Sequence, residues 1–194
     1  MTFLLSLLAA KGLGALIGGL LLLIQQSPGF ASPELIVRND TVYVRTSLTH
    51  GFNKDLDRLL ESGSLVAVAY TANVFARDRE GGTAEFAPFS FYHSAVYDPA
   101  SGNYTVYRSE LRGRPDSLSI TEGLGQTRSK LTSVMAPIYR ASRLPPESEY
   151  SCRIEAALNT IELEGTDGKE LDLNVFWNYR YPRCITPWTK LTRP

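Results

Sequence analysis

The chain has 194 residues, of which 43% are hydrophobic and 21% are charged, and this is the composition of an ordinary globular protein with one main domain. Lysine plus arginine and aspartate plus glutamate each number 20, so no net field attracts nucleic acid and we expect no nucleic-acid partner. Two cysteines and two distant histidines make no ligand cluster, so we expect no metal and no other cofactor.

The N-terminus predicts a leader that directs the chain out of the cytoplasm. The run from Gly12 to Ile24 is apolar or glycine throughout, which is the length of a signal-peptide core, and a lysine precedes it. Gly29 and Ala31 stand at the small-residue positions of a cleavage site. We therefore expect residues 1–31 to be a signal peptide, or an uncleaved N-terminal membrane anchor, and residues 32–194 to form a single β-rich domain.

The domain begins with a strand and a short helix. In "DTVYVRTSL" apolar and polar residues alternate, which predicts a half-buried strand over residues 40–48. The next segment, "GFNKDLDRLLESG", has apolar residues at helical spacing, with Asn53 as the N-cap and Gly63 as the left-handed stop. Because this helix has fewer than four turns, we expect its apolar stripe to dock on a sheet.

A central strand and two hairpins follow. The segment "SLVAVAYTANVFARD" (64–78) is apolar on both faces at its start, which is typical of a central strand. The loop "RDREGGT" (77–83) and the turn "DPASGN" (98–103) each predict a hairpin.

The segment after the second hairpin predicts a loop or short strand and then a helix. "GRPDSLSITEG" (113–123) is the loop or strand, and a second helix is expected over 124–135, ended by Pro137. The apolar face of that helix comprises Leu124, Leu131, Val134 and Met135.

The last third predicts two more strands. "SEYSCRIEAALNTIEL" (148–163) alternates cleanly, and a turn is expected around Asp167 and Gly168. The final strand has inward residues Leu171, Leu173, Val175 and Trp177. Several strands joined by short turns, with two small helices, predict a mainly β fold: an antiparallel β-sandwich or a curved sheet.

The two cysteines, Cys152 and Cys184, are compatible with two states. In a reducing cytosol they are two buried thiols, whereas in an exported chain an even pair predicts a disulfide. Cys152 faces inward on its predicted strand and Cys184 follows the next strand, so the sulfurs meet if the end of that strand folds back over the sheet.

The two histidines do not predict a catalytic site. His50 lies in a turn before the first helix and His93 lies in an aromatic strand. A catalytic histidine needs a nucleophile or an acid within reach, and the chain has no Gly-x-Ser-x-Gly elbow. We therefore expect no enzyme; the alternative is a hydrolase with an unrecognised site, in which His50 or His93 lies beside a serine or a carboxylate.

Aromatic residues predict a binding surface wherever one aromatic face is exposed. Alternation in "FAPFSFYHSAVY" (86–97) places Phe86 and Tyr92 on the same face. The candidate surface comprises Phe86, Tyr92, Tyr179, Tyr181 and Trp188. The alternatives are two-sided burial inside a sandwich and, for the "YRYPR" segment, a solvated edge strand.

Three segments resemble a bacterial family called domain of unknown function 4390. They are "LDRLLESGSLVAVAYTANVFARD", "EYSCRIEAALN" and the terminal "ITPWTKL", and the likeness runs in order over about residues 35–191. The chain departs from the family pattern in its cysteine pair and in lacking a Leu-Pro step before the last aromatic strand. The resemblance implies an exported bacterial protein with no assigned activity and no known catalytic residues.

We expect an envelope protein in the periplasm or on the outer face of the inner membrane that binds another protein without enzymatic activity. Its partner would be an envelope or inner-membrane protein, and its membrane contact would be limited to an uncleaved N-terminus. An alternative is a carrier or sensor of an apolar ligand, which requires a cavity lined by residues such as Tyr70, Phe91 and Trp177.

Overall fold

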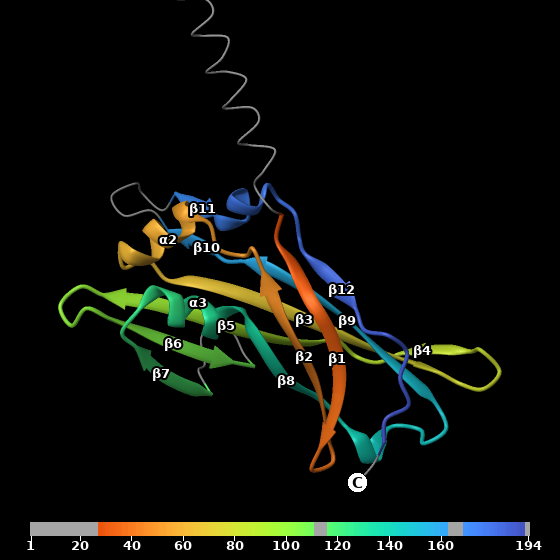
Figure 1. Ribbon diagram of the computed structural model, residues 1–194. Helices are drawn as coiled ribbons and strands as arrows, with labels where there is room; N and C mark the ends of the chain where they lie inside the picture. Colours follow the sequence, from red (N-terminus) through yellow and green to blue (C-terminus); the bar gives the residue numbers. More distant parts are fainter. Residues whose placement is uncertain (1–26, 111–115, 163–168, 193–194) are drawn as a thin grey trace, which may run out of the picture.

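The structure is a computed structural model that describes residues 27–110, 116–162 and 169–192 (Figure 1). The fold is mainly β, as predicted, with antiparallel sheets and two short α-helices. Within these ranges no helix is both long and apolar enough to cross a membrane. The predicted leader lies outside the described residues as far as residue 26.

The larger sheet has seven strands. Six of them follow the order β12-β9-β3-β5-β6-β7, and β4 pairs with the end of β3. Their bounds are β3 Val66–Arg77, β4 Thr83–Glu85, β5 Phe89–Asp98, β6 Asn103–Ser109, β7 Ser117–Thr121, β9 Glu149–Leu158 and β12 Arg183–Ile185. The central position of β3 between β9 and β5 is confirmed, as are the hairpins β3–β4 and β5–β6.

A smaller sheet of three strands lies across one face of the larger one (Figure 1). Its order is β1-β2-β8, with bounds β1 Gly29–Arg38, β2 Thr41–Thr49 and β8 Ser133–Arg140. The short elements are η1 Ala141–Arg143, β10 Thr160–Glu162, β11 Glu170–Asp172 and η2 Leu173–Trp177. The turn predicted around Asp167 and Gly168 lies outside the described residues, and the flanking strands β10 and β11 pair antiparallel.

The first helix, α2 (Lys54–Glu61), has the predicted caps. The side chain of Asn53 accepts hydrogen bonds from the backbone N–H groups of Asp55 and Leu56 at 3.1 and 3.0 Å. Gly63 follows the helix with φ of +89°, a conformation that costs a residue with a Cβ atom free energy. Leu56 and Leu60 are fully buried, so the short helix is held by the core.

The second helix is shorter than predicted. Helix α3 ends at Thr132 (Leu124–Thr132), and the chain passes directly into β8. Val134 and Met135 therefore lie on opposite faces of a strand, where they pair with Thr46 and Arg45 of β2. Pairing with β2 outweighs the helical spacing, and Pro137 is accommodated because β8 is an edge strand, where a missing N–H does not break a ladder.

The predicted final strand is also corrected. After Asp172 the chain forms the 3₁₀ helix η2, because the Asp172 carboxylate accepts from the N–H of Asn174 at 2.9 Å. The amide of Asn174 in turn bonds both backbone groups of Leu158 on β9. Leu173 and Trp177 are buried as predicted, whereas Val175 is exposed.

The N-terminal boundary of the domain lies before Ser32. Strand β1 begins at Gly29, and residues 29–31 pair with residues 47–49 of β2. The ring of Phe30 packs on the core with its centroid 6.4 Å from that of Tyr70. Cleavage after Ala31, as the sequence predicts it, would remove the first part of a paired strand.

Buried side chains from both sheets and both helices form one core. On β3 the inward residues are Val66, Val68, Tyr70, Ala72, Val74 and Ala76. The small sheet, α2 and α3 supply the rest of the packing on this side, so the larger sheet has one covered face, called here the inner face, and one outer face.

Candidate functional site

The outer face of the seven-stranded sheet is an accessible surface. Along β3 every second side chain is buried, and the alternate ones from Ala67 to Arg77 stay partly exposed. The same alternation continues on β5, where Tyr92, Ser94 and Val96 are partly exposed. This face is therefore a surface on which side chains from neighbouring strands lie side by side.

One half of the outer face, over β5, β6 and β7, has no charged residue in its central rows and is called here the uncharged half; the one acid of β5 on this face, Asp98, lies at the end of the strand. The register places Ile120 beside Thr105 and Thr105 beside Val96. In the next row, Leu118 lies beside Tyr107. Leu118 is 59% and Ile120 is 63% exposed, so two large apolar side chains meet solvent here without a charged neighbour in their rows.

The other half, over β3, β4 and β9, is charged. Arg153 lies 3.7 Å from Glu85 and 3.4 Å from Glu155, and its guanidinium lies over the ring of Phe75. These ion pairs are exposed by a third or more, so each contributes little to stability.

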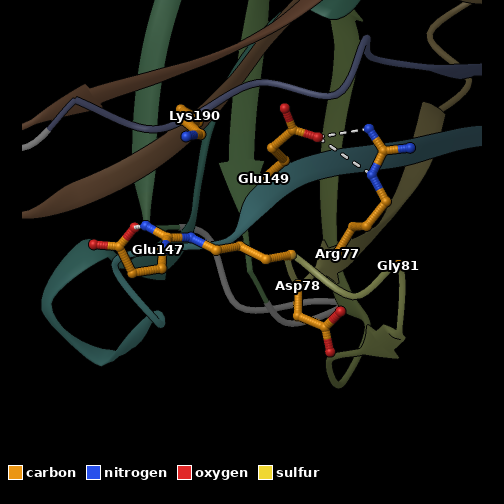
Figure 2. A pocket seen from close by; sticks show the side chains of 7 residues that line it. Arg77, Asp78, Gly81, Glu147, Glu149 and Lys190 are labelled. Atoms are coloured by element: carbon orange, nitrogen blue, oxygen red, sulfur yellow. Dashed lines mark hydrogen bonds and ion pairs between the residues drawn. The ribbon is translucent and has the colours of Figure 1, made fainter.

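A hollow of about 430 Å³ opens at the end of this charged half (Figure 2). Arg77 of β3 binds Glu149 of β9 through two nitrogens, at 2.6 and 3.2 Å, and its guanidinium lies 4.6 Å from the ring centre of Trp188. Arg79 pairs with Glu147 across the opening. The lining residues are Arg77, Asp78, Arg79, Gly81, Glu147, Glu149 and Lys190.

The charges of this hollow are balanced among themselves. Arg77 and Arg79 each have a carboxylate partner, and one Asp78 oxygen accepts the N–H groups of Glu80 and Gly82 at 3.0 and 2.7 Å. Among the described residues, neither Asp78 nor Lys190 has an ion-pair partner in this hollow. The hollow therefore offers positioned charges, and it brings together no nucleophile with a base.

The aromatic residues predicted to form one binding surface are spread over the molecule. Phe86 continues the inner row of β3, because its N–H bonds Val74, and its ring contacts Tyr139. Tyr92 pairs with Ala69 on the outer face, so Phe86 and Tyr92 lie on opposite faces and that part of the prediction is wrong.

The three C-terminal aromatic residues also separate. Tyr179 and Tyr181 are more than half exposed in the segment between η2 and β12, and the backbone of Tyr179 has a positive φ of 54°. Trp188 lies beneath the guanidinium of Arg77 at the hollow. A kink in the chain after Trp177, at two consecutive left-handed residues, is what breaks the alternation that the prediction assumed.

His93 is a buried core residue. Its ring contacts Tyr70 and Phe91, with centroids 5.1 and 5.7 Å away, and its Nδ1 lies 3.1 Å from the carbonyl oxygen of Leu131. Burial, together with the nearby charge of Arg108, lowers the pKa of His93 to about 4. The ring is thus neutral near pH 7 and is held by a backbone group, with no nucleophile among these contacts. His50 is exposed in a turn with φ of 54°.

The three residues named for a cavity that holds an apolar ligand are buried and contact other protein groups. Tyr70 is fully buried, stacks on Phe91 at 5.1 Å and donates its hydroxyl proton to the carbonyl oxygen of Leu131 at 2.8 Å. Burial also raises the pKa of this hydroxyl, so it remains protonated. Trp177 is buried as well, with its indole N–H donating to the carbonyl oxygen of Gly51 at 2.8 Å.

An ion pair with a buried carboxylate, absent from the predictions above, joins the two helices. Asp57 of α2 and Arg128 of α3 form it, with Asp57 8% exposed. Burial raises the pKa of Asp57 and the charge of Arg128 opposes this rise. Its sequence position marks Asp57 only as an acid in the first turn of α2, and no local pattern indicates a partner as distant in sequence as Arg128.

The two cysteines are free thiols, which corrects the disulfide prediction. Strand β12 places Cys184 opposite Ile154, whereas the residue bonded to the backbone of Cys152 is Thr186, so the cysteines are offset by two residues. Burial raises the pKa of Cys152 to about 12 and that of Cys184 to about 11. Both sulfurs are therefore protonated, unreactive thiols near pH 7.

Across the described ranges, no three histidine, cysteine, aspartate or glutamate side chains converge on a point that could hold a metal ion. No protein-family model matches the chain, and neither a curated protein nor a solved structure does. The uncharged half of the outer face, with Leu118 and Ile120, is thus the candidate site that the geometry supports. Its sequence signal is the alternation in "SLSIT", within the segment for which the sequence predicts a loop or a short strand.

Proposed function

We propose that this chain is a non-enzymatic protein that binds another protein through the uncharged half of its outer sheet face. The observation that carries the proposal is the pair of side chains Leu118 and Ile120, 59% and 63% exposed, in rows continued by Tyr107 and Val96. Large exposed apolar groups gathered on one face mark interaction sites in monomeric proteins.

Export to the envelope is part of the same proposal. Its support is the apolar run from Gly12 to Ile24 and the resemblance to a family of exported bacterial proteins. The partner is then an envelope or inner-membrane protein, reached in the periplasm or at the outer face of the inner membrane. The paired charges of the hollow and the aromatic contacts of His93 favour binding over catalysis.

Site-specific photo-crosslinking in intact bacterial envelopes tests the proposal. A benzophenone amino acid replaces Tyr107 on the outer face, and in a matched control it replaces Tyr43, a partly exposed tyrosine on β2 of the small sheet. We expect an adduct of one discrete mass from position 107 and none from position 43. No protein adduct at position 107 would contradict the proposal, and a co-purifying lipid or small molecule instead of a protein would favour the carrier.

A further inference from the structure

The N-terminal end of the described domain lies beside η2 and the start of β12 (Figure 1). Ser27 is the first described residue, and its hydroxyl oxygen accepts a hydrogen bond from the guanidinium of Arg180, in the segment that joins η2 to β12. The apolar run of the sequence ends at Ile24, three residues before Ser27. Because three residues span at most about 11 Å, the apolar run must end close to this part of the domain.

Strand β1 contains the predicted cleavage site. Gly29 pairs with Thr49 and Ala31 pairs with Ser47, so both small residues belong to the small sheet. Cleavage after Ala31 would take these paired residues from the domain, and the structure therefore favours a leader that stays attached.

A retained leader is long enough to act as a membrane anchor. Residues 1–24 exceed the roughly 20 residues that a bilayer span needs. Lys11 is their only charged residue, and leucines and other large apolar residues on both sides of it offset its cost in a span.

Exposed aromatic and apolar side chains lie where the chain leaves the domain. Tyr179 and Tyr181 flank Arg180, the residue that binds Ser27, and they are 57% and 53% exposed. Val175 of η2 is 39% exposed. Tyr179, Tyr181 and Val175 are called here the exit patch.

The backbone that carries the exit patch is fixed to the domain. The N–H of Tyr179 donates to the carbonyl oxygen of Asn174 in η2 at 2.9 Å. After Tyr181, the carbonyl oxygen of Pro182 accepts the N–H of Ala156 on β9 at 3.0 Å. The two exposed tyrosines are thus held in place by bonds on both sides of the segment.

We propose that residues 1–24 remain attached as a membrane anchor and that the exit patch lies in the headgroup layer of the membrane that this anchor enters. Tyrosine suits this layer because its ring is apolar and its hydroxyl is polar, and it is enriched at both interfaces of membrane proteins. The membrane contact of the chain then extends from the N-terminus to the surface of the folded domain.

Net charge does not select the membrane at this end of the domain. Arg180 and Arg183 are exposed, but so are Glu162 and Glu170 of the β10–β11 hairpin, which lies at the same end (Figure 1). Residues 163–168, outside the described ranges, include two further acids. We therefore expect neutral phosphatidylcholine to suffice, and we expect the contact to persist as salt rises.

The uncharged half of the outer face stays accessible in this arrangement. Strands β12 and β7 stand at opposite ends of the strand order, so the exit patch and the surface proposed for a protein partner lie toward different edges of the sheet. The inference shares with the proposed function only the export of the chain.

Fluorescence quenching by lipid tests the contact in the full chain, reconstituted in phosphatidylcholine vesicles. An environment-sensitive fluorescent amino acid replaces Tyr181, and in a matched control it replaces Tyr43. Tyr43 is partly exposed, and it lies six residues before Thr49, the partner of Gly29, which is about 20 Å along β2. Phosphatidylcholine with a nitroxide on its headgroup should quench position 181 at least threefold more than position 43. Equal quenching, or none at position 181, would overturn the proposal.

A pair of variants assigns the contact to the tyrosines. With the fluorescent amino acid in place of Val175, the double change Tyr179→Ser and Tyr181→Ser should at least halve the quenching, and Tyr43→Ser should leave it unchanged. Melting curves like that of the unchanged chain show that each variant folds. Unchanged quenching in the double variant would overturn the role of the tyrosines.

The intact mass of the chain isolated from bacterial envelopes tests the anchor. We expect a mass that includes residues 1–24, and a chain that lacks them would overturn the proposal. A protein adduct from position 107 with no lipid quenching at position 181 would overturn this inference and leave the proposed function standing. A photo-crosslink from position 181 to a protein, again without lipid quenching, would also overturn it, in favour of a protein as the occupant.

Discussion

The inner and outer faces of the seven-stranded sheet differ although the same strands form both. On β3, Val66, Val68 and Tyr70 are fully buried, while the alternate residues Ala67 and Ala69 are partly exposed. Buried polar side chains on the inner face have hydrogen-bond partners within the protein. Tyr70 and His93, for example, both lie within hydrogen-bond distance of the carbonyl oxygen of Leu131. The even-numbered residues of β3 therefore stabilise the fold by packing in the core, and its odd-numbered residues form part of the accessible surface.

The largest expected effect is on the inner face. Tyr70→Ala removes a ring that is fully buried and stacked on Phe91, so we expect it to lower the free energy of unfolding by about 3–5 kcal/mol. Tyr92→Ala, on the outer face of the neighbouring strand, should cost about 1 kcal/mol or less. Urea denaturation of both variants gives the comparison, and similar losses would contradict a division into two faces.

The next largest loss of stability is expected when the first residues of β1, which pack over the inner face, are removed. A chain that begins at Ser32 lacks Phe30, which packs near Tyr70, and lacks the carbonyl of Ala31, which accepts a hydrogen bond from the hydroxyl of Thr46. We expect a loss of about 2–3 kcal/mol relative to a chain that begins at Ser27. Denaturation of the two purified chains measures it, and equal stability would show that the first residues of β1 are dispensable.

Acid should weaken the inner face through His93. Its pKa falls from an ordinary value of 6.5 to about 4 in the folded chain. The unfolded chain therefore binds more protons between these values, and stability is complete above about pH 6.5 and lost as the pH falls toward 4. This group should cost about 2 kcal/mol between pH 7 and pH 5.

Denaturation at both pH values, with His93→Gln as the control, isolates that contribution from the carboxylates. The variant should show a pH-dependent loss smaller by about 2 kcal/mol. An unchanged difference between pH 7 and pH 5 in the variant would assign the acid sensitivity to other groups.

The smallest effect is expected at the charged half of the outer face. Arg77→Ala breaks the pair with Glu149, whose side chains are 39% and 37% exposed, and removes the contact with Trp188. Because exposed pairs contribute little, the expected loss is about 1 kcal/mol or less. The change in Trp188 fluorescence should report the altered contact even where urea denaturation shows little, and a loss as large as that of Tyr70→Ala would mean that this face is structural.

Local sequence patterns predicted the elements that are determined by a few consecutive residues. The alternation of β3 and the capping of α2 by Asn53 are properties of a few consecutive residues, and the structure confirms both. Local patterns failed where contacts with residues distant in sequence determine the secondary structure. Val134 leaves the helical pattern because β2 pairs with it, and Asn174 turns the expected strand into a 3₁₀ helix by bonding Leu158.

The candidate site was predicted least well, for a related reason. The prediction relied on large aromatic residues such as Phe86 and Trp188, but Phe86 packs inward and Trp188 lies under the guanidinium of Arg77. Leu118 and Ile120 are ordinary in sequence, and only the place of β7 at the end of the strand order makes them exposed. Sheet order depends on pairings across the whole chain, which local alternation does not encode.

The pairing of β2 with β8 has a consequence for folding. Thr41 lies opposite Arg140, so β2 can pair with β8 only after most of the chain has been synthesised. Until then β2 has one unpaired side, and β3 likewise waits for β9. Contacts this distant in sequence slow folding and prolong the time during which strand edges are open to wrong partners. A nascent chain of this protein is thus most vulnerable to aggregation before β8 and β9 emerge.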